Sequence, residues 1–371
     1  MKVFVGSTGI ERVRGGLESS FIETHVALKE CKGLKSWLFK GSGKCHNDEF
    51  ILWNISRLSP AASSIGKLIH RPNPYVIEQL SSVLPMFAAI KKHRPDIVFY
   101  SEVNLGMALY RLRPVLGGNF KLIYSNGGPG NPPFPFTDHV HQVAPYYLDL
   151  AVKANVPETM QTMIPHGISA KPITFEKHQE RKQALRKELG LPLDRQVVLA
   201  VGWVSRTHKR ADYIIREIAT MKSERPFLLM LGRIDASSHE IQALAQELLD
   251  PSDYRIQSVS YEQVFNYYLT ADLFIHAALK EGFGKVLTEA LMHGLPCIAH
   301  DHPVMRYVLG SFGNFYNLEL DDALAEAIHH QLKEPFDSQA AYQRNQYIRE
   351  NFSWDVLTPR YIDMFKKVIN A

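Results

Sequence analysis

Residues 272–301 read DLFIHAALKEGFGKVLTEALMHGLPCIAHD, and this stretch decides the fold class. It opens with a short apolar run rich in β-forming residues, which predicts a buried strand. Two glycines, Gly282 and Gly284, then permit a tight turn into a segment whose apolar residues recur at helical spacing. Gly294 and Pro296 end that helix before a second apolar run begins. The order strand, glycine turn, helix, strand predicts one unit of a parallel sheet covered by helices.

The same rhythm continues on both sides of this stretch. Apolar runs separated by helical segments return about every 25 residues, a pattern typical of α/β proteins with doubly wound sheets. The chain is therefore expected to form two Rossmann-like domains, a number that its 371 residues also favour. The runs begin at Val3, Ser36, Asp96, Lys121, Asp138, Val197, Pro226, Tyr254, Asp272 and Leu295.

The rhythm pauses over residues 171–195, where charges and flanking prolines replace apolar residues. This predicts a solvated helix within a linker, between a first domain over 1–170 and a second over 196–345. The segment 346–371 is predicted to be helical, and because no strand follows it, it is expected to cross back over the domains. Two open sheets joined in this way would face each other across a cleft, with ligands outside the carboxyl ends of their strands.

Composition excludes several classes of protein. Hydrophobic residues make up 45% and charged residues 22% of the chain, which argues against disorder and coiled coil. The formal net charge is only +4, too small a surplus to indicate nucleic-acid binding. Three cysteines without a C-x-x-C spacing suggest neither a disulfide framework nor a zinc site, so we expect a cytoplasmic protein. No apolar run approaches the roughly 18 residues of a membrane span, so the protein is soluble, or peripheral on the inner membrane face at most.

Two glutamates give the deciding stretch its chemistry. Glu281 precedes the glycine turn, and Glu289 lies on the following helix, just off its apolar edge. The free amides at the start of that helix would bind an anion. Carboxylates beside such a site can accept hydrogen bonds from vicinal hydroxyls. The constellation predicts a pocket for a sugar attached to a phosphate.

With these residues, the sequence resembles the retaining glycosyltransferases of family 4, which have the GT-B fold and a motif of two glutamates separated by seven residues. The resemblance extends over most of the chain. Its further landmarks are Gly15-Gly16-Leu17 after the first strand, Pro165-His166-Gly167-Ile168 at the domain junction, Val201-Gly202 followed by Lys209, and Phe352-Ser353-Trp354 near the C-terminus.

The resemblance implies a role for each matching residue. Glu281 would contact the donor sugar, Glu289 the ribose hydroxyls of the nucleotide, and Lys209 the leaving diphosphate. Gly16 would add a phosphate contact from the first domain, and the base would lie near Arg233 and Val259. The remaining donor-binding positions follow the first glutamate: Gly282, Phe283, Gly284, Lys285 and Val286.

Departures from the family pattern concern three positions. Trp203 replaces the usual arginine after the Val-Gly pair, so Arg206 is the candidate for the second cation on the diphosphate. The sequence is equally consistent with an Arg206 side chain that is exposed to solvent and contacts no phosphate. The first domain often carries a histidine where this chain has Asn126 and Gly127, which we take as candidate contacts to the donor sugar or the acceptor.

The expected reaction is transfer of a hexose-type sugar, with retention, from a nucleotide diphosphate sugar to a hydroxyl acceptor. UDP is favoured over GDP, and the acceptor is a glycan, a lipid-linked sugar or a small-molecule sugar. Stabilising the departing diphosphate would dominate catalysis. The resemblance favours front-face transfer, and since the sequence holds no Asp-x-Asp motif, neither a metal nor another cofactor is expected.

Alternatives stay open at this point. The chain could be a catalytically silent nucleotide-sugar binder or a partner subunit, or another GT-B enzyme such as an epimerase or a phosphorylase. Three basic segments of the first domain could meet an anionic or membrane-bound acceptor: Lys91 to Arg94, Arg111 to Arg113, and Arg57 to Arg71. Oligomeric state is not indicated by the sequence.

Overall fold

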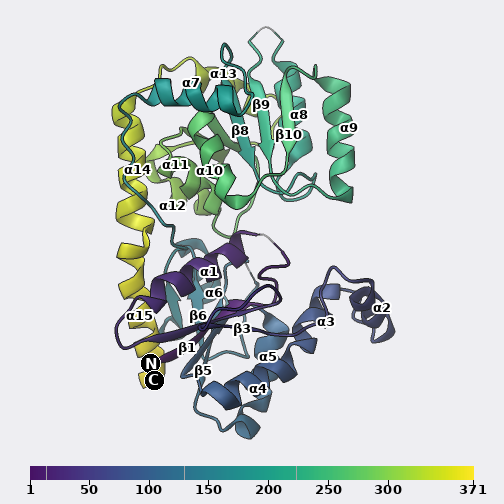
Figure 1. Cartoon of the computed structure of the whole chain (residues 1–371), viewed down its shortest axis with the longest axis vertical. Helices are drawn as coiled ribbons and strands as arrows, with labels where there is room; N and C mark the ends of the chain where they lie inside the picture. Colours follow the sequence, from purple (N-terminus) through teal and green to yellow (C-terminus); the bar gives the residue numbers. More distant parts are fainter. Residues whose placement is uncertain (14, 129, 223) are drawn as a thin grey trace. The chain divides into compact units, whose positions relative to one another are not determined.

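The structure is a computed structural model that describes residues 1–13, 15–128, 130–222 and 224–371. The chain divides into two compact units, of which unit 1 comprises Met1–Ser169 together with Ser353–Ala371, and unit 2 comprises Ala170–Phe352. Each unit is an α/β fold built on its own parallel sheet (Figure 1). No helix among the described residues has the length and hydrophobicity to cross a bilayer.

Unit 1 contains a seven-stranded sheet in the order β3-β2-β1-β4-β5-β6-β7, with every neighbouring pair parallel. Its strands are β1 (Lys2–Ser7), β2 (Lys35–Lys40), β3 (Glu49–Ile51), β4 (Ile97–Tyr100), β5 (Lys121–Ser125), β6 (His139–Gln142) and β7 (Gln161–Met163). Its helices are α1 (Gly16–Lys29), α2 (Pro60–Leu68), α3 (Pro74–Ser81), α4 (Val83–His93), α5 (Val103–Leu116), α6 (Pro145–Lys153) and α15 (Trp354–Asn370), with a short 3-10 turn at Glu158–Met160.

Unit 2 contains a six-stranded parallel sheet in the order β10-β9-β8-β11-β12-β13. Its strands are β8 (Val197–Val201), β9 (Phe227–Leu231), β10 (Tyr254–Gln257), β11 (Leu273–His276), β12 (Cys297–His300) and β13 (Gly313–Tyr316). Its helices are α7 (His178–Glu188), α8 (Ala211–Thr220), α9 (His239–Leu248), α10 (Tyr261–Thr270), α11 (Lys285–Met292), α12 (Pro303–Leu309), α13 (Ala323–Leu332) and α14 (Ser338–Phe352), with 3-10 turns at Ala236–Ser238 and Gly310–Phe312.

The two faces of the unit 1 sheet carry separate cores, as the alternation along β1 shows. Phe4 packs with residues of α4 and α5, including Met86 and Leu109. Its neighbours Val3 and Val5 point to the opposite face, where α1 and α15 cover the sheet. Burial on both faces explains why these strands read as continuous apolar runs.

All ten expected strands are present, and three short ones were not predicted. The unpredicted strands β3, β7 and β13 are three or four residues long and lie at sheet edges. Their residues are mostly half-buried and partly polar, because an edge strand has a neighbour on one side only. They therefore show no apolar run.

The C-terminal segment differs in detail from the single helix expected over 346–371. The chain forms α14 in unit 2 and α15 in unit 1, interrupted at Ser353, whose backbone is extended. Leu357, Tyr361 and Phe365 of α15 are buried in the core that covers Val3 and Val5. The last helix is therefore part of the unit 1 core.

The segment 171–195 is not a plain solvated linker. Its helix α7 belongs to unit 2 and buries Lys182 and Arg186, which both form ion pairs with Asp272 just before β11. The prediction of a solvated helix is wrong for these two side chains, because the charged pattern conceals buried ion pairs. A charge run and a buried ion-pair network look alike in the sequence.

Candidate functional site

Strand order reverses in unit 2 between β8 and β11, the place where open α/β sheets bind ligands outside the carboxyl ends of their strands. The chain leaves β8 at Gly202, whose φ of +152° lies in a region that side chains rarely adopt. A Cβ there would meet the Lys209 side chain at 3.0 Å, and a Cβ on Gly232 would lie 1.7 Å from the Gly202 oxygen. Glycines are thus required where Lys209 folds back over the strand end.

Glu281 is the centre of a charged cluster at this position. It follows β11 in the chain, and its buried carboxylate accepts a hydrogen bond from Lys209 Nζ. His208 Nε2 lies 3.1 Å and His276 Nε2 2.9 Å from the same oxygen, Glu281 Oε1. The structure therefore brings the predicted Lys209 and Glu281 together and adds two imidazoles.

Electrostatics keep this carboxylate ionised. Burial alone would raise the pKa of Glu281, but the ammonium of Lys209 and the hydrogen bonds from His208 and His276 outweigh it and hold the pKa well below its usual value. Burial also lowers the pKa of His276, and the charge of Lys209 lowers it further. A neutral imidazole can lie beside the carboxylate without adding a second buried charge.

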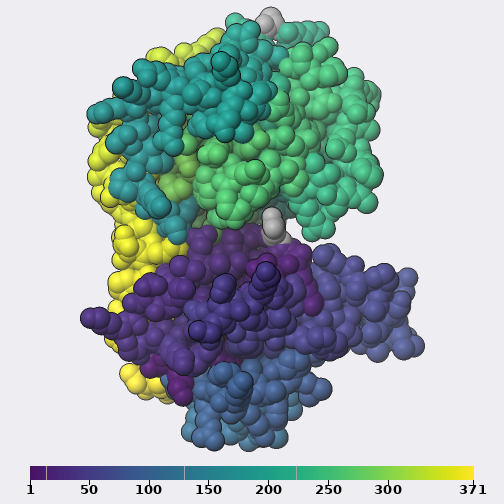
Figure 2. All heavy atoms as spheres, viewed as in Figure 1, coloured from purple at the N-terminus to yellow at the C-terminus, as the bar shows by residue number. Residues whose placement is uncertain are grey.

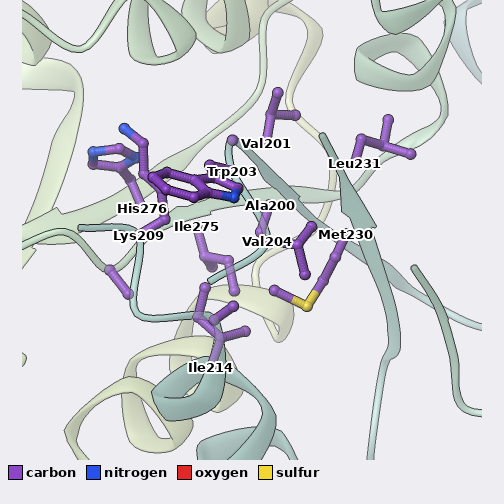
Figure 3. Close-up of a pocket in the computed structure, with 13 residues that line it drawn as sticks. Ala200, Val201, Trp203, Val204, Lys209, Ile214, Met230, Leu231, Ile275 and His276 are labelled. Atoms are coloured by element: carbon purple, nitrogen blue, oxygen red, sulfur yellow. The ribbon is translucent and has the colours of Figure 1, made fainter. Parts of the chain in front are cut away.

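A pocket adjoins this cluster at the end of β8, and Figure 3 shows Trp203, Lys209 and His276 on its border. The Trp203 indole is 39% exposed, and the Arg233 guanidinium lies over it, 5.0 Å from the ring centroid. Arg233 also pairs with Asp235 at 2.8 Å. Trp203 thus presents an aromatic surface where the family pattern has a cation. The apolar residues behind it include Ala200, Val204, Ile214, Met230 and Ile275.

Helix α11 begins directly after the glycine turn. Gly284 precedes it with a φ of +82°, and Lys285 is its first residue. The Phe283 ring is buried against Phe352, with ring centroids 5.8 Å apart, so this side chain has a packing role. Gly282 is buried as well, and Val286 is half-buried.

Glu289 is buried on α11, and two phenols bind its carboxylate. Tyr268 donates to Oε2 at 2.8 Å and Tyr261 to Oε1 at 3.1 Å. Burial raises the pKa of Tyr268 well above its usual value, and the charge of Glu289 raises it further. The carboxylate thus accepts hydroxyl donors in this structure, which is the kind of bond predicted for it with a ribose.

The other predicted residues of unit 2 are more dispersed. Arg206 is 55% exposed and pairs with Glu240 of α9 at 3.4 Å. Val259 is half-buried in the loop after β10. Arg206 therefore contacts an acid outside the Lys209 and Glu281 cluster.

The predicted residues of unit 1 lie on separate elements. Gly16 is exposed at the start of α1, with no atom within 4 Å of where a Cβ would be. Asn126 is buried, donating to Gln142 Oε1 at 2.9 Å and accepting from the Gly130 amide at 2.5 Å. A Cβ on Gly127 would lie 2.7 Å from His166 Nε2. Asn126 therefore organises its own loop.

Sequence reasoning missed His208, His276 and the two tyrosines. His276 carried a usable signal, because it is the polar last residue of a buried strand at the end where ligands bind. Tyr261 and Tyr268 lie on α10 and carried none, since helical aromatic residues usually signal core packing. Among the described residues, no group of three or more His, Cys, Asp or Glu side chains is arranged to hold a metal ion.

Comparison with known proteins gives a family match for part of the chain. Residues 181–350 match the family model described as glycosyl transferases group 1. A Bacillus subtilis (strain 168) protein named as the teichuronic acid biosynthesis glycosyltransferase TuaC is 30% identical over 182 residues. This match covers 47% of the present chain and 43% of that protein, so the chain spans less than half the length of its curated relative.

Solved structures match the whole chain in fold. Sucrose-phosphate synthase from Thermosynechococcus elongatus has a TM-score of 0.77 at 17% identity, covering 100% of this chain and 99% of that one. Anabaena Alr3699/HepE in complex with UDP and glucose has a TM-score of 0.73 at 14% identity, covering 98% and 99%. These identities show the fold alone, and they confirm the predicted architecture. The chain thus has the GT-B fold, and its residues 181–350 match the glycosyl transferase group 1 family model.

Proposed function

We propose that the protein is a retaining glycosyltransferase of the family 4 type that takes a hexose from a nucleotide diphosphate sugar, with UDP as the favoured nucleotide. The observation that carries this proposal is the Lys209, Glu281 and His276 cluster at the β8/β11 end of a group 1 domain. One structure of this fold holds UDP and glucose, so a pocket for UDP is compatible with the fold.

Chemistry at the cluster follows from its charges. Sugar transfer leaves negative charge on the departing diphosphate, which a preorganised ammonium stabilises. Lys209 supplies that ammonium, and Glu281 offsets its charge while no donor is bound. When the donor diphosphate engages Lys209, the Glu281 carboxylate becomes able to accept hydroxyls of the sugar. His276 would retain its contact with Glu281 and fix the carboxylate orientation.

The mechanism that we propose is front-face transfer, in which the leaving phosphate accepts the proton of the acceptor hydroxyl. The acceptor is a glycan, a lipid-linked sugar or a small-molecule sugar, and neither a metal nor another cofactor takes part. A reducing, cytoplasmic compartment belongs to the same proposal, in keeping with Cys31, Cys45 and Cys297, which are free thiols. Anomeric configuration of the product, read by NMR, tests retention, and activity in EDTA tests the absence of a metal.

The deciding experiment is a calorimetric titration with UDP, GDP and ADP, followed by turnover assays on two variants. Lys209→Met and Glu281→Gln should each lower kcat by about 100-fold, the scale of one lost transition-state contact. Lys187→Met, which changes an exposed lysine of α7, is the matched control and should leave kcat unchanged. Near-normal rates in both site variants would refute the assignment. Tight nucleotide binding without turnover on any acceptor would favour a silent homologue instead.

A further inference from the structure

Charge is unevenly distributed over unit 1. Residues 50–137 contain nine lysines and arginines but only three acids, Glu78, Asp96 and Glu102. Glu78 and Glu102 are fully buried, and Asp96 accepts a hydrogen bond from the Lys2 amide. Arg57 pairs with Glu78 and Arg113 with Asp138. The other seven basic residues of this segment have almost no exposed acid to offset them and give it a basic surface.

The end of α2 is the most apolar part of this surface. Leu68 is 79% exposed and Ile69 is 46% exposed. Lys67 precedes them, and His70 and Arg71 follow, all three exposed. We call residues 67–71 the α2 tip. Single exposed apolar residues are ordinary on a protein surface, but two adjacent ones enclosed by basic side chains form an amphipathic patch.

Backbone hydrogen bonds fix the α2 tip in shape. The Arg71 amide donates to the Gly66 carbonyl at 2.8 Å, and the His70 amide donates to the Lys67 carbonyl at 3.2 Å. His70 has a φ of +56°, so the helix ends in a complete Schellman motif with a non-glycine residue in the left-handed position. A frayed helix end would not make both bonds. Leu68 and Ile69 are therefore held outward by a defined turn.

The segment 57–78, which carries the α2 tip, is held in place by contacts at its two ends. Arg57 donates twice to Glu78 Oε1, at 3.0 and 2.6 Å, and lies 3.6 Å over the ring of Tyr75. Ser59 caps the start of α2 by accepting from the Ala62 amide. Figure 1 shows α2 at the right of unit 1 with α3 between it and α5, and in Figure 2 the same segment stands out at the right edge. The tip is thus a preformed projection rather than a loose loop.

We infer that the α2 tip docks on the surface of an anionic lipid bilayer, with Leu68 and Ile69 entering the interface and Lys67 and Arg71 facing the lipid phosphates. Charge complementarity favours an anionic bilayer as the partner of the α2 tip. A second copy joined through the same patch would place like charges opposite each other, since a two-fold interface is self-complementary. Residues 50–77 contain no acid that could offset that repulsion.

The test is flotation of the full-length protein, without nucleotide, on vesicles of phosphatidylglycerol and phosphatidylcholine in equal parts. Binding is expected to these vesicles and not to pure phosphatidylcholine. Lys67→Gln with Arg71→Gln should weaken binding by roughly 25-fold, because each basic residue near an anionic surface contributes about five-fold. Leu68→Ser with Ile69→Ser should weaken it by about ten-fold or more through lost apolar burial.

Matched controls use exposed residues of unit 2. Leu320→Ser removes an apolar side chain of similar exposure, and Arg181→Gln with Lys187→Gln removes two exposed charges of α7. Both should bind vesicles like the wild type. Equal binding of the tip variants and the wild type would overturn the inference, as would equal binding to neutral vesicles or no binding at all. A dimer in light scattering that the Leu68 and Ile69 variant abolishes would assign the patch to a second copy instead. None of these outcomes depends on transferase activity.

Discussion

Asp272→Asn should destabilise unit 2 by about 3 kcal/mol. Asp272 Oδ2 accepts hydrogen bonds from Arg186 Nη2 and from the Val197 amide, each at 2.6 Å, and Oδ1 accepts from Lys182 Nζ. The side chains of Lys182 and Arg186 are only 4% exposed, so the neutral amide would leave two buried cations without their counterion. Removing one partner of a buried pair costs about 3 to 5 kcal/mol. We take the lower end because the Asp272 side chain is 21% exposed.

Scanning calorimetry of the full chain measures this effect. In a unit of this size, about 3 kcal/mol corresponds to a fall in Tm of roughly 6 to 12 °C. Adding Lys182→Met to Asp272→Asn should recover part of the loss, because one unpaired cation is removed with it. A loss below about 1 kcal/mol, the range of an exposed pair, would refute the reasoning.

The same group gives a dependence on pH. Burial would raise the pKa of Asp272, but the charges of Lys182 and Arg186 outweigh it and lower the pKa. A lowered folded-state pKa means that the contribution is complete above the unfolded value of about 3.9 and is lost as pH falls through the folded value. The stability difference between wild type and Asp272→Asn should therefore shrink below about pH 4.

Three further variants test the site and the packing. Glu289→Gln should weaken UDP binding by about ten-fold in calorimetry, because a neutral amide accepts hydroxyl hydrogen bonds less strongly than a carboxylate. The same variant should lower the raised pKa of Tyr268 in an ultraviolet titration. An unchanged UDP affinity together with an unchanged Tyr268 pKa would contradict the structure. Gly16→Ala should keep Tm within about 1 °C, because the new Cβ meets open space. It should weaken UDP binding if the amides at the start of α1 hold a phosphate. Equal UDP affinity of variant and wild type would remove Gly16 from the donor site. Gly106→Ala should lower Tm by several degrees, because its Cβ would lie 2.2 Å from the Tyr100 ring, and a wild-type Tm would show that the ring can move aside.

The fold could be predicted because buried parallel strands leave a strong pattern. Strands with neighbours on both sides mostly appeared as apolar runs, as β1 and β8 illustrate. Of the edge strands only β10 was predicted, and the short ones were not found; β13, for example, reads GNFY and its residues are only half-buried. The helix α7 was misread for a related reason: its two buried cations resemble surface charges until Asp272, about 90 residues later, is placed beside them.

Motifs in the sequence indicated where the candidate site lies, but not which side chains contact its residues. Glycine spacing and two glutamates located the turn before α11, whereas the contact between Lys209 and Glu281 was not predicted. His276 lies at the end of β11, only five residues before Glu281, so its position could have been found from the sequence. Tyr268 lies on α10, and its contact with Glu289 has no local sequence signature, because it arises only when α10 and α11 pack together.

The burial of α15 in the core of unit 1 has a consequence for synthesis on the ribosome. Unit 2 is continuous in the chain, so all its residues have been translated before α15 is. Unit 1 must wait, with one apolar face of its sheet covered by α1 alone, until Leu357, Tyr361 and Phe365 arrive. We expect a released chain that ends at residue 352 to protect unit 2 from protease while unit 1 is still cleaved. Equal protection of both units would show that the first 169 residues fold without their last helix.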